Sequence, residues 1–259
     1  MPESLLPPPS EIHLWFVFCD GITDRSLLRR YRDMLSADER EREPRFVMSR
    51  SRHRYLLTRA LLRTTLSRYA AVSPSDWSFQ TDPYGRPSIA NRITEIASLS
   101  FNISHTENLV LLGVTRACAL GVDVESVRAR TPTLELAERY FSPLEASDLR
   151  AAPSTEQHER FFRYWTLKES YIKARGLGLS IPLDQFAFRI RGSKLTLQVE
   201  EQLGDRAERW RFWLLRPCAD HTTAVCVERA SGAQTLVIRE VVPLQSERPL
   251  PCEELGRSG

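Results

Sequence analysis

Residues 164–174 read YWTLKESYIKA, and this stretch says most about the fold and the chemistry of the chain. Its large apolar residues recur at the spacing of an α-helix, so we predict a helix over residues 156–175. Glu169 and Lys173 are four residues apart, which places a carboxylate and an ammonium group one turn apart on the same side of that helix.

The basic residues of the chain are almost all arginine, and the lysines are few: Lys168, Lys173 and Lys194. Arginine keeps its proton near neutral pH, whereas burial and neighbouring charges can tune the pKa of a lysine. Lys173 is therefore a candidate general acid. The simpler alternative is an ordinary surface ion pair with Glu169, which would contribute only ~0.3–0.5 kcal/mol to stability.

Glu169 lies in line with an apolar stripe of the predicted helix, formed by Phe161, Trp165 and Ile172. A carboxylate on the inward-facing side of a helix needs a partner, because burial without one is costly. We therefore expect Glu169 to belong to a site and not to the solvated surface.

A second acidic cluster lies in residues 119–125, which we predict to be a strand. Because side chains alternate along a strand, its two valines face one side, and Asp123 and Glu125 face the other. Two such carboxylates repel each other unless a cation lies between them, and their oxygens suit Mg²⁺ bound together with substrate phosphates. Glu169 would supply a third oxygen. The D-x-E pattern is weak alone, where a solvated strand face is the better interpretation, so the combination carries this prediction.

Residues 99–106 read LSFNISHT, an alternating strand that ends in a polar tip. His105 could bind a phosphate there, although a single histidine is more often structural, and nothing gives it metal-ligand spacing. Ser104 and His105 cannot act as a catalytic pair, because adjacent residues of a strand point to opposite faces.

Four blocks of the sequence resemble, in order, the signature blocks of the Sfp-type 4′-phosphopantetheinyl transferases. They are YGRP at 84–87, FNISH at 101–105, GVDVE at 121–125 and WTLKESYIKA at 165–174. The resemblance runs from about residue 35 to about residue 227. It implies an α+β fold of two similar α/β halves related by a pseudo-twofold axis, with the active site between them.

We expect an N-terminal half over residues 11–118, which would hold the 3′-phosphoadenosine end of coenzyme A, and a C-terminal half over residues 119–243, which would carry Mg²⁺ and the catalytic residues. Residues 1–10 and 244–259 lack periodic apolar positions, so we predict loose tails there. The patterns predict helices at 24–35, 51–69, 133–140 and 156–175 and strands at 12–19, 77–80, 99–103, 109–115, 119–125, 186–190, 195–199, 209–215, 222–228 and 236–241.

The resemblance implies transfer of the phosphopantetheine arm of coenzyme A to a serine of an apo acyl, polyketide or peptidyl carrier protein, with release of 3′,5′-ADP and with Mg²⁺ on the pyrophosphate. It assigns Asp123, Glu125 and Glu169 to the metal, and Asp123, Glu169 and Lys173 to catalysis. Glu169 would take the serine proton, directly or through water, and Lys173 would stabilise or protonate the departing phosphate.

The resemblance also assigns residues to coenzyme A. Besides Lys173, they are Arg42, Arg54, Gly85, Arg86, Pro87, Ser104 and His105. Glu39 stands where some members of the family have a basic residue. One phosphate contact is therefore expected to be missing there or to come from another residue, such as Arg45.

Composition excludes several classes of protein. At 259 residues the chain can bury a substantial core, and no apolar run approaches the ~20 residues that span a bilayer. The first residues lack a signal-peptide pattern, so we expect a cytoplasmic protein without a membrane partner. The five cysteines are scattered and odd in number, which favours reduced thiols over a disulfide framework or a zinc site.

Two alternatives stand beside the transferase. Residues 25–68 are rich in arginine, as in proteins that bind nucleic acid, but coenzyme A and an acidic carrier suit a basic surface equally well. Binding of nucleic acid would also give Asp123 and Glu125 no role, so we expect no such partner. The other alternative is a catalytically silent relative that binds coenzyme A or a carrier, and the presence of every assigned carboxylate argues against it. By analogy with the larger Sfp-type chains, we expect a monomer.

Overall fold

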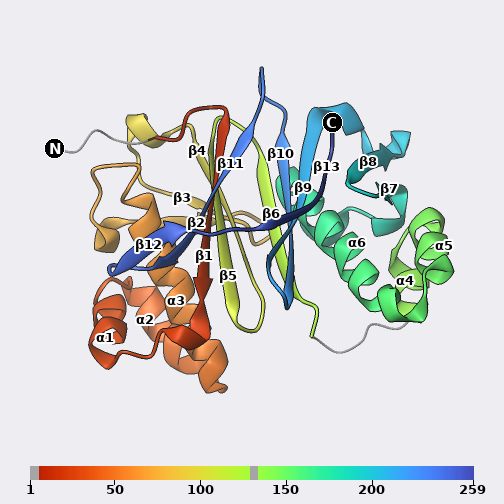
Figure 1. Cartoon of the computed structure of the whole chain (residues 1–259). Helices are drawn as coiled ribbons and strands as arrows, with labels where there is room; N and C mark the ends of the chain where they lie inside the picture. The colour runs from red at the N-terminus through yellow and green to blue at the C-terminus, as the bar shows by residue number, and fades with distance from the viewer. Residues whose placement is uncertain (1–5, 129–133) are drawn as a thin grey trace. The chain divides into compact units, whose positions relative to one another are not determined.

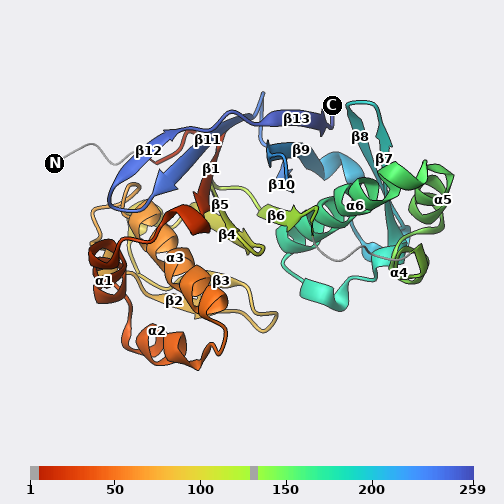
Figure 2. The same ribbon diagram turned by 60° about the horizontal axis from the view of Figure 1, so that its bottom comes forward.

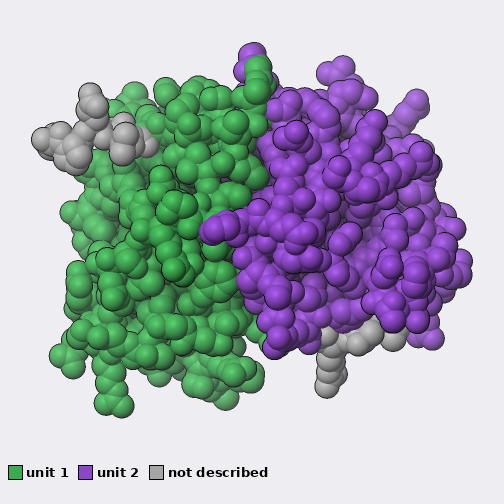
Figure 3. All heavy atoms as spheres, in the orientation of Figure 1, with its two compact units in different colours: residues 1–117, 232–250 green, residues 118–231, 251–259 purple. Residues whose placement is uncertain are grey.

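The structure is a computed structural model that describes residues 6–128 and 134–259 (Figure 1). The chain divides into two compact units: unit 1 is residues 1–117 with 232–250, and unit 2 is residues 118–231 with 251–259 (Figure 3). Each unit has helices, a sheet and a buried apolar cluster of its own, as the predicted α+β class requires. No helix in the described parts of the chain is long and apolar enough to cross a membrane.

Unit 1 is built on a five-stranded sheet in the order β12-β11-β1-β5-β4. Its elements are β1 (Glu11–Phe18), α1 (Arg25–Asp33), α2 (Ala37–Arg42), α3 (Ser49–Leu66), β2 (Phe79–Thr81), β3 (Pro87–Ile89), β4 (Leu99–His105), β5 (Leu109–Arg116), β11 (Thr235–Val242) and β12 (Ser246–Pro249). The apolar side of α3 lies against the sheet, because Leu57 and Leu61 join Val17 and Leu112 in one buried cluster (Figure 2).

Unit 2 contains a six-stranded sheet in the order β6-β10-β9-β13-β8-β7. Its elements are β6 (Leu120–Ser126), α4 (Leu134–Tyr140), α5 (Pro143–Ala151), α6 (Ser154–Arg175), β7 (Phe186–Arg191), β8 (Lys194–Val199), β9 (Trp210–Cys218), β10 (His221–Glu228) and β13 (Glu253–Arg257). The long helix α6 lies across β6 and β10, where Leu167 and Tyr171 are fully buried (Figure 2).

The two units share one connectivity. Among the described residues of each unit, a strand is followed by three α-helices and then by two hairpins. The first strand pairs antiparallel with the last strand of the second hairpin, β1 with β5 in unit 1 and β6 with β10 in unit 2. The prediction of two similar halves is confirmed at the level of topology.

The predicted boundaries are wrong toward the C-terminus. β11, expected in the C-terminal half over residues 119–243, pairs in parallel with β1 and belongs to unit 1. The segment 244–259, expected to be a loose tail, contains β12, which pairs with β11, and β13, which lies between β9 and β8. Both strands are short and mostly exposed, so backbone pairing holds them to the sheets without an apolar alternation that a pattern could reveal.

At the other end, residues 1–5 of the predicted N-terminal tail lie outside the described residues. Leu6 packs against the core of unit 1, so the tail prediction for residues 1–10 is wrong at this position.

Sequence patterns also missed α2 and α5, although each begins with a capping box. The pairs are Ser36 with Glu39 in α2 and Ser142 with Glu145 in α5. In each pair the serine hydroxyl accepts a hydrogen bond from the backbone amide of the glutamate, and the glutamate carboxylate accepts one from the backbone amide of the serine. The S-x-x-E signature is visible in the sequence at both places.

Lys168 fixes α6 to its neighbours through a fully buried ion pair with the α5 residue Glu145. Its Nζ lies 2.7 Å from Glu145 Oε2 and donates hydrogen bonds of 2.7 Å to the carbonyls of Leu183 and Phe186. Burial lowers the pKa of Lys168, and the Glu145 carboxylate opposes that effect. Lys168 is therefore a structural lysine, in contrast to Lys173.

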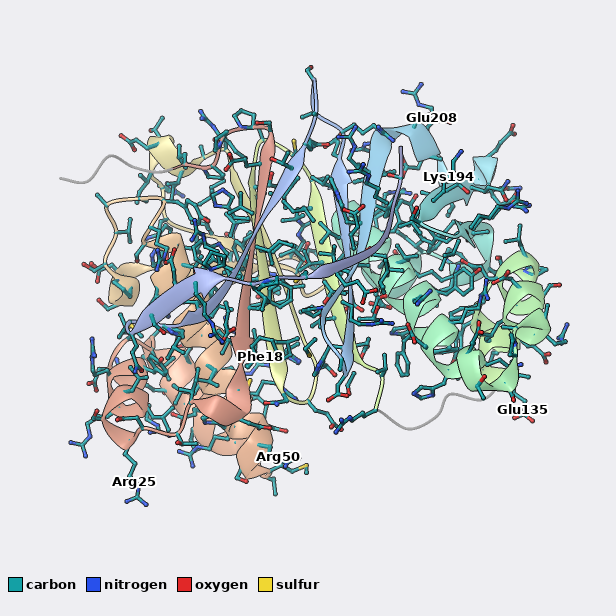
Figure 4. All side chains as sticks on the ribbon, viewed as in Figure 1. Phe18, Arg25, Arg50, Glu135, Lys194 and Glu208 are labelled. Atoms are coloured by element: carbon teal, nitrogen blue, oxygen red, sulfur yellow. The ribbon has the colours of Figure 1, made fainter. Side chains whose placement is uncertain are left out.

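Replacing Lys168 by methionine should strongly destabilise the fold, because Glu145 would remain as a buried charge without its partner. We expect Lys168→Met to lower the free energy of unfolding by about 3–5 kcal/mol, measured by urea denaturation. Lys194→Met is the matched control, because Lys194 is exposed on the β7–β8 hairpin (Figure 4) and should change stability by less than about 0.5 kcal/mol. Equal losses in the two variants would contradict the structural role of Lys168.

Candidate active site

At Gly121 the backbone of β6 lies close to the backbone of α6. A Cβ atom at this position would lie 2.0 Å from the carbonyl oxygen of Ser170 and 2.4 Å from the amide nitrogen of Ala174. Both are backbone atoms of α6, so a larger residue would have to push the whole helix away from the strand. The glycine thus lets the last turns of α6 lie on the strand that carries the acidic residues (Figure 2).

Three carboxylates gather beside this contact. Burial, followed by the charge of Asp123, raises the pKa of Glu125 to about 7, with a smaller contribution from Glu169. The same two causes, burial first, raise the pKa of Glu169. The structure therefore brings Asp123 and Glu125 of β6 and Glu169 of α6 into one electrostatic cluster, as the sequence pattern predicts.

Lys173 supplies the balancing positive charge. Its Nζ lies 2.6 Å from Asp123 Oδ1, and its charge opposes the rise in the pKa of both Glu125 and Glu169. The Asp123 side chain is only 5% exposed, whereas the Lys173 side chain is 26% exposed. The ion pair therefore links β6 to α6, with its carboxylate shielded from solvent and its lysine partly accessible to solvent.

Trp165 also belongs to this cluster, although the sequence pattern predicted it only as part of the apolar stripe of the helix. Its indole donates a hydrogen bond to the Glu125 carboxylate, which lowers the pKa of Glu125 against the effect of burial. The ring also stacks on Phe161, with centroids 6.0 Å apart. Its position one turn before Glu169 on α6 was the available signal.

The donor set suits a divalent cation, although no ready-made metal site exists among the described residues. Three carboxylates repel one another, and the Lys173 ammonium group occupies the position beside Asp123 that a metal ion could take. Mg²⁺ commonly binds through one or two carboxylates and completes its shell with phosphate and water oxygens. Asp123, Glu125 and Glu169 therefore fit a metal that arrives together with a phosphate ligand.

A separate pocket of about 200 Å³ lies in unit 1. It brings together four residues assigned to coenzyme A, namely Arg42, Arg54, Pro87 and His105. Arg54 of α3 is held in place by a 3.0 Å hydrogen bond from its Nη1 to the carbonyl of Thr106, just after β4.

Three further residues assigned to coenzyme A, Gly85, Arg86 and Ser104, do not line this pocket, although they are close in sequence to Pro87 and His105, which do. Gly85 has a φ of +86°, which suits glycine, and closes the turn between β2 and β3 by donating its amide to the carbonyl of Asp82 at 3.0 Å. Burial lowers the pKa of Arg86, which follows in the same turn. Ser104 is buried and His105 is exposed, in line with strand alternation.

We expect Gly121→Ala to lower the free energy of unfolding by at least about 1–3 kcal/mol, because the new Cβ overlaps the backbone of α6. Gly21→Ala is the control, since a Cβ at Gly21 meets no atom within 4 Å. Urea denaturation measures both. A Gly121→Ala protein as stable as the wild type would contradict the close approach of α6 to β6.

The raised pKa of Glu125 predicts a pH-dependent effect on stability. The folded protein holds the Glu125 proton more tightly than the unfolded chain, so ionisation costs stability from about pH 4.5 upward and the cost is complete above about pH 7. In metal-free protein, Glu125→Gln should therefore melt above the wild type at pH 8, and this difference should vanish toward pH 4.5.

Asp24→Asn provides a control of opposite sign. Hydrogen bonds from Ser26 and Leu27 lower the pKa of Asp24, so the stability that its charge contributes is fully present above about pH 3.8. This variant should therefore melt below the wild type by an amount that stays the same from about pH 4.5 to about pH 8. Parallel melting curves of Glu125→Gln and wild type across this pH range would contradict the carboxylate cluster.

Known proteins match both units of the chain. The family model described as the 4′-phosphopantetheinyl transferase superfamily matches residues 119–226, and the model described as 4′-phosphopantetheinyl transferase, N-terminal, matches residues 24–116. The chain is 36% identical over 179 residues to the 4′-phosphopantetheinyl transferase HetI of Nostoc sp., covering 69% of this chain and 74% of HetI. It is 34% identical over 177 residues to the 4′-phosphopantetheinyl transferase Sfp of Bacillus subtilis, covering 68% and 76%. The chain belongs to the 4′-phosphopantetheinyl transferase superfamily.

Proposed function

We propose that this protein transfers the 4′-phosphopantetheine group of coenzyme A to a serine hydroxyl of an apo carrier protein and releases 3′,5′-ADP. The observation that supports this most is the cluster of Asp123, Glu125 and Glu169 with Lys173 at its edge. Attack on a phosphoryl centre requires mainly positioning and neutralisation of charge, so carboxylates that can hold a cation, a base and a cationic donor are sufficient.

Asp123, Glu125 and Glu169 would hold Mg²⁺, which when bound neutralises the charge of the pyrophosphate. Glu169 is also the proposed base for the carrier serine. Its raised pKa makes it a stronger base than an exposed glutamate while it is ionised, and brings its titration closer to neutral pH. Lys173, the more exposed member of its ion pair, would donate a hydrogen bond or a proton to the departing phosphate.

The pocket of unit 1 is the proposed site of the 3′-phosphoadenosine end of coenzyme A. Arg42, Arg54 and His105 line it with groups that can donate to phosphate oxygens, and Pro87 gives it part of its apolar wall. The Gly85–Arg86 turn would position Pro87. We propose that the enzyme acts as a cytoplasmic monomer, without nucleic-acid or membrane partners, on acyl, polyketide or peptidyl carrier domains.

Intact-mass spectrometry of an apo carrier domain incubated with this protein, coenzyme A and Mg²⁺ tests the proposal. We expect the carrier to gain one phosphopantetheine group, and EDTA to prevent the gain. Glu169→Gln and Asp123→Ala should slow transfer by about 100-fold or more with an unchanged circular dichroism spectrum, and Lys173→Arg should also be impaired. Glu156→Gln, at an exposed position of the same helix, should be fully active.

Two results would contradict the proposal in different ways. No mass gain on acyl, polyketide or peptidyl carriers, with coenzyme A still bound, would favour a silent relative. Full activity of Lys173→Arg would remove the role of this lysine as a proton donor, because arginine does not release its proton near neutral pH.

A further inference from the structure

The pocket of unit 1 that contains Arg54 and His105 is one-sided in charge. The described residues that line it include three arginines, Arg42, Arg54 and Arg59, together with His105, and none of them is an aspartate or a glutamate. Such a lining favours a ligand group with more than one negative charge. The resemblance assigns three of these four residues to coenzyme A but says nothing of Arg59.

Arg59 is poorly compensated by its protein neighbours. Its nearest acid is the Glu39 carboxylate, and the Arg59 Nε is 3.5 Å from Glu39 Oε1, beyond the usual length of an N–H···O hydrogen bond. The buried Arg63 holds the other oxygen of Glu39, with its Nη2 at 2.8 Å and its Nε at 2.9 Å. Arg63 thus already neutralises Glu39, and the Nε of Arg59 is buried without a hydrogen-bond partner.

The side chain of Arg59 is nevertheless well placed. Its guanidinium carbon lies 5.4 Å from the centre of the Tyr55 ring, and Tyr55 lines the same pocket. Both residues belong to α3, one turn apart, and Arg54 lies on the same helix. A rigid helix therefore presents two arginines to this pocket.

Arg45 is a weaker candidate for the missing phosphate contact. Its side chain is 74% exposed and faces Glu41 at 3.8 Å. It lines a different, more open hollow that also contains Asp38 and Glu41. Arg45 is not among the described residues that line the pocket of Arg54 and His105.

We propose that Arg59 binds the 3′-phosphate of coenzyme A and makes this enzyme select coenzyme A over 3′-dephospho-coenzyme A. A phosphate monoester carries a charge of about −1.5 to −2 at neutral pH, and a guanidinium can bind two of its oxygens at once. Arg59 supplies the cation that Glu39 does not. This inference rests on the proposed function, because it assumes that coenzyme A is the substrate.

Transfer kinetics with the two substrates test the inference. Arg59→Gln should lower kcat/KM for coenzyme A by about tenfold or more, mainly through KM, and change kcat/KM for 3′-dephospho-coenzyme A by less than about twofold. Arg59→Lys should retain part of the discrimination. Arg50→Gln removes the same charge from the exposed start of α3 (Figure 4), outside this pocket, and should leave the ratio of the two substrates unchanged.

Calorimetric binding of 3′,5′-ADP and of 5′-AMP separates this inference from the proposed function, because it needs no transfer. The wild type should bind 3′,5′-ADP at least about tenfold more tightly, and Arg59→Gln should remove that difference even if no carrier is modified. Equal losses for both substrates or both nucleotides would show that Arg59 acts through the fold. An unchanged preference in Arg59→Gln, or no preference in the wild type, would equally overturn the inference.

Discussion

The backbone of α6 lies directly on Gly121 of β6, and the rest of the candidate site depends on this contact. The strand alone offers only two acids on one face, and the helix alone offers only a glutamate and a lysine one turn apart. Because no side chain separates the two backbones, Glu169 lies close enough to Asp123 that, in addition to burial, the Asp123 charge raises the pKa of Glu169. For the same reason Lys173 reaches the Asp123 carboxylate at 2.6 Å. The carboxylate cluster of unit 2 therefore depends on the absence of a side chain at Gly121.

The two lysines of α6 show how burial separates a structural role from a chemical one. The Lys168 ammonium group is surrounded by the Glu145 carboxylate and two backbone carbonyls, so buried protein groups satisfy its charge and its hydrogen bonds. Lys173 meets one carboxylate and keeps part of its side chain exposed. A site that must exchange its balancing cation for a ligand needs the second arrangement, because a fully enclosed ion pair is costly to break.

Much of this arrangement could be predicted from the sequence. The alternation in residues 119–125 and the helical stripe of residues 156–175 gave the right elements, and with them the acids of β6 and α6. The pattern could not give the partner of Lys168, because Glu145 is distant in sequence, nor the β13 strand, whose pairing depends on backbone hydrogen bonds. Arg59 was likewise hidden among many arginines, since only the fold shows that another arginine neutralises Glu39.

We propose that the contact of α6 with β6 brings three carboxylates together to hold a cation. Anomalous diffraction from crystals grown with coenzyme A and Mn²⁺, a substitute for Mg²⁺, would locate this cation. We expect one manganese peak at bonding distance from carboxylate oxygens of Asp123, Glu125 and Glu169. Coenzyme A bound with no manganese at these oxygens, and with Lys173 still paired to Asp123, would contradict it.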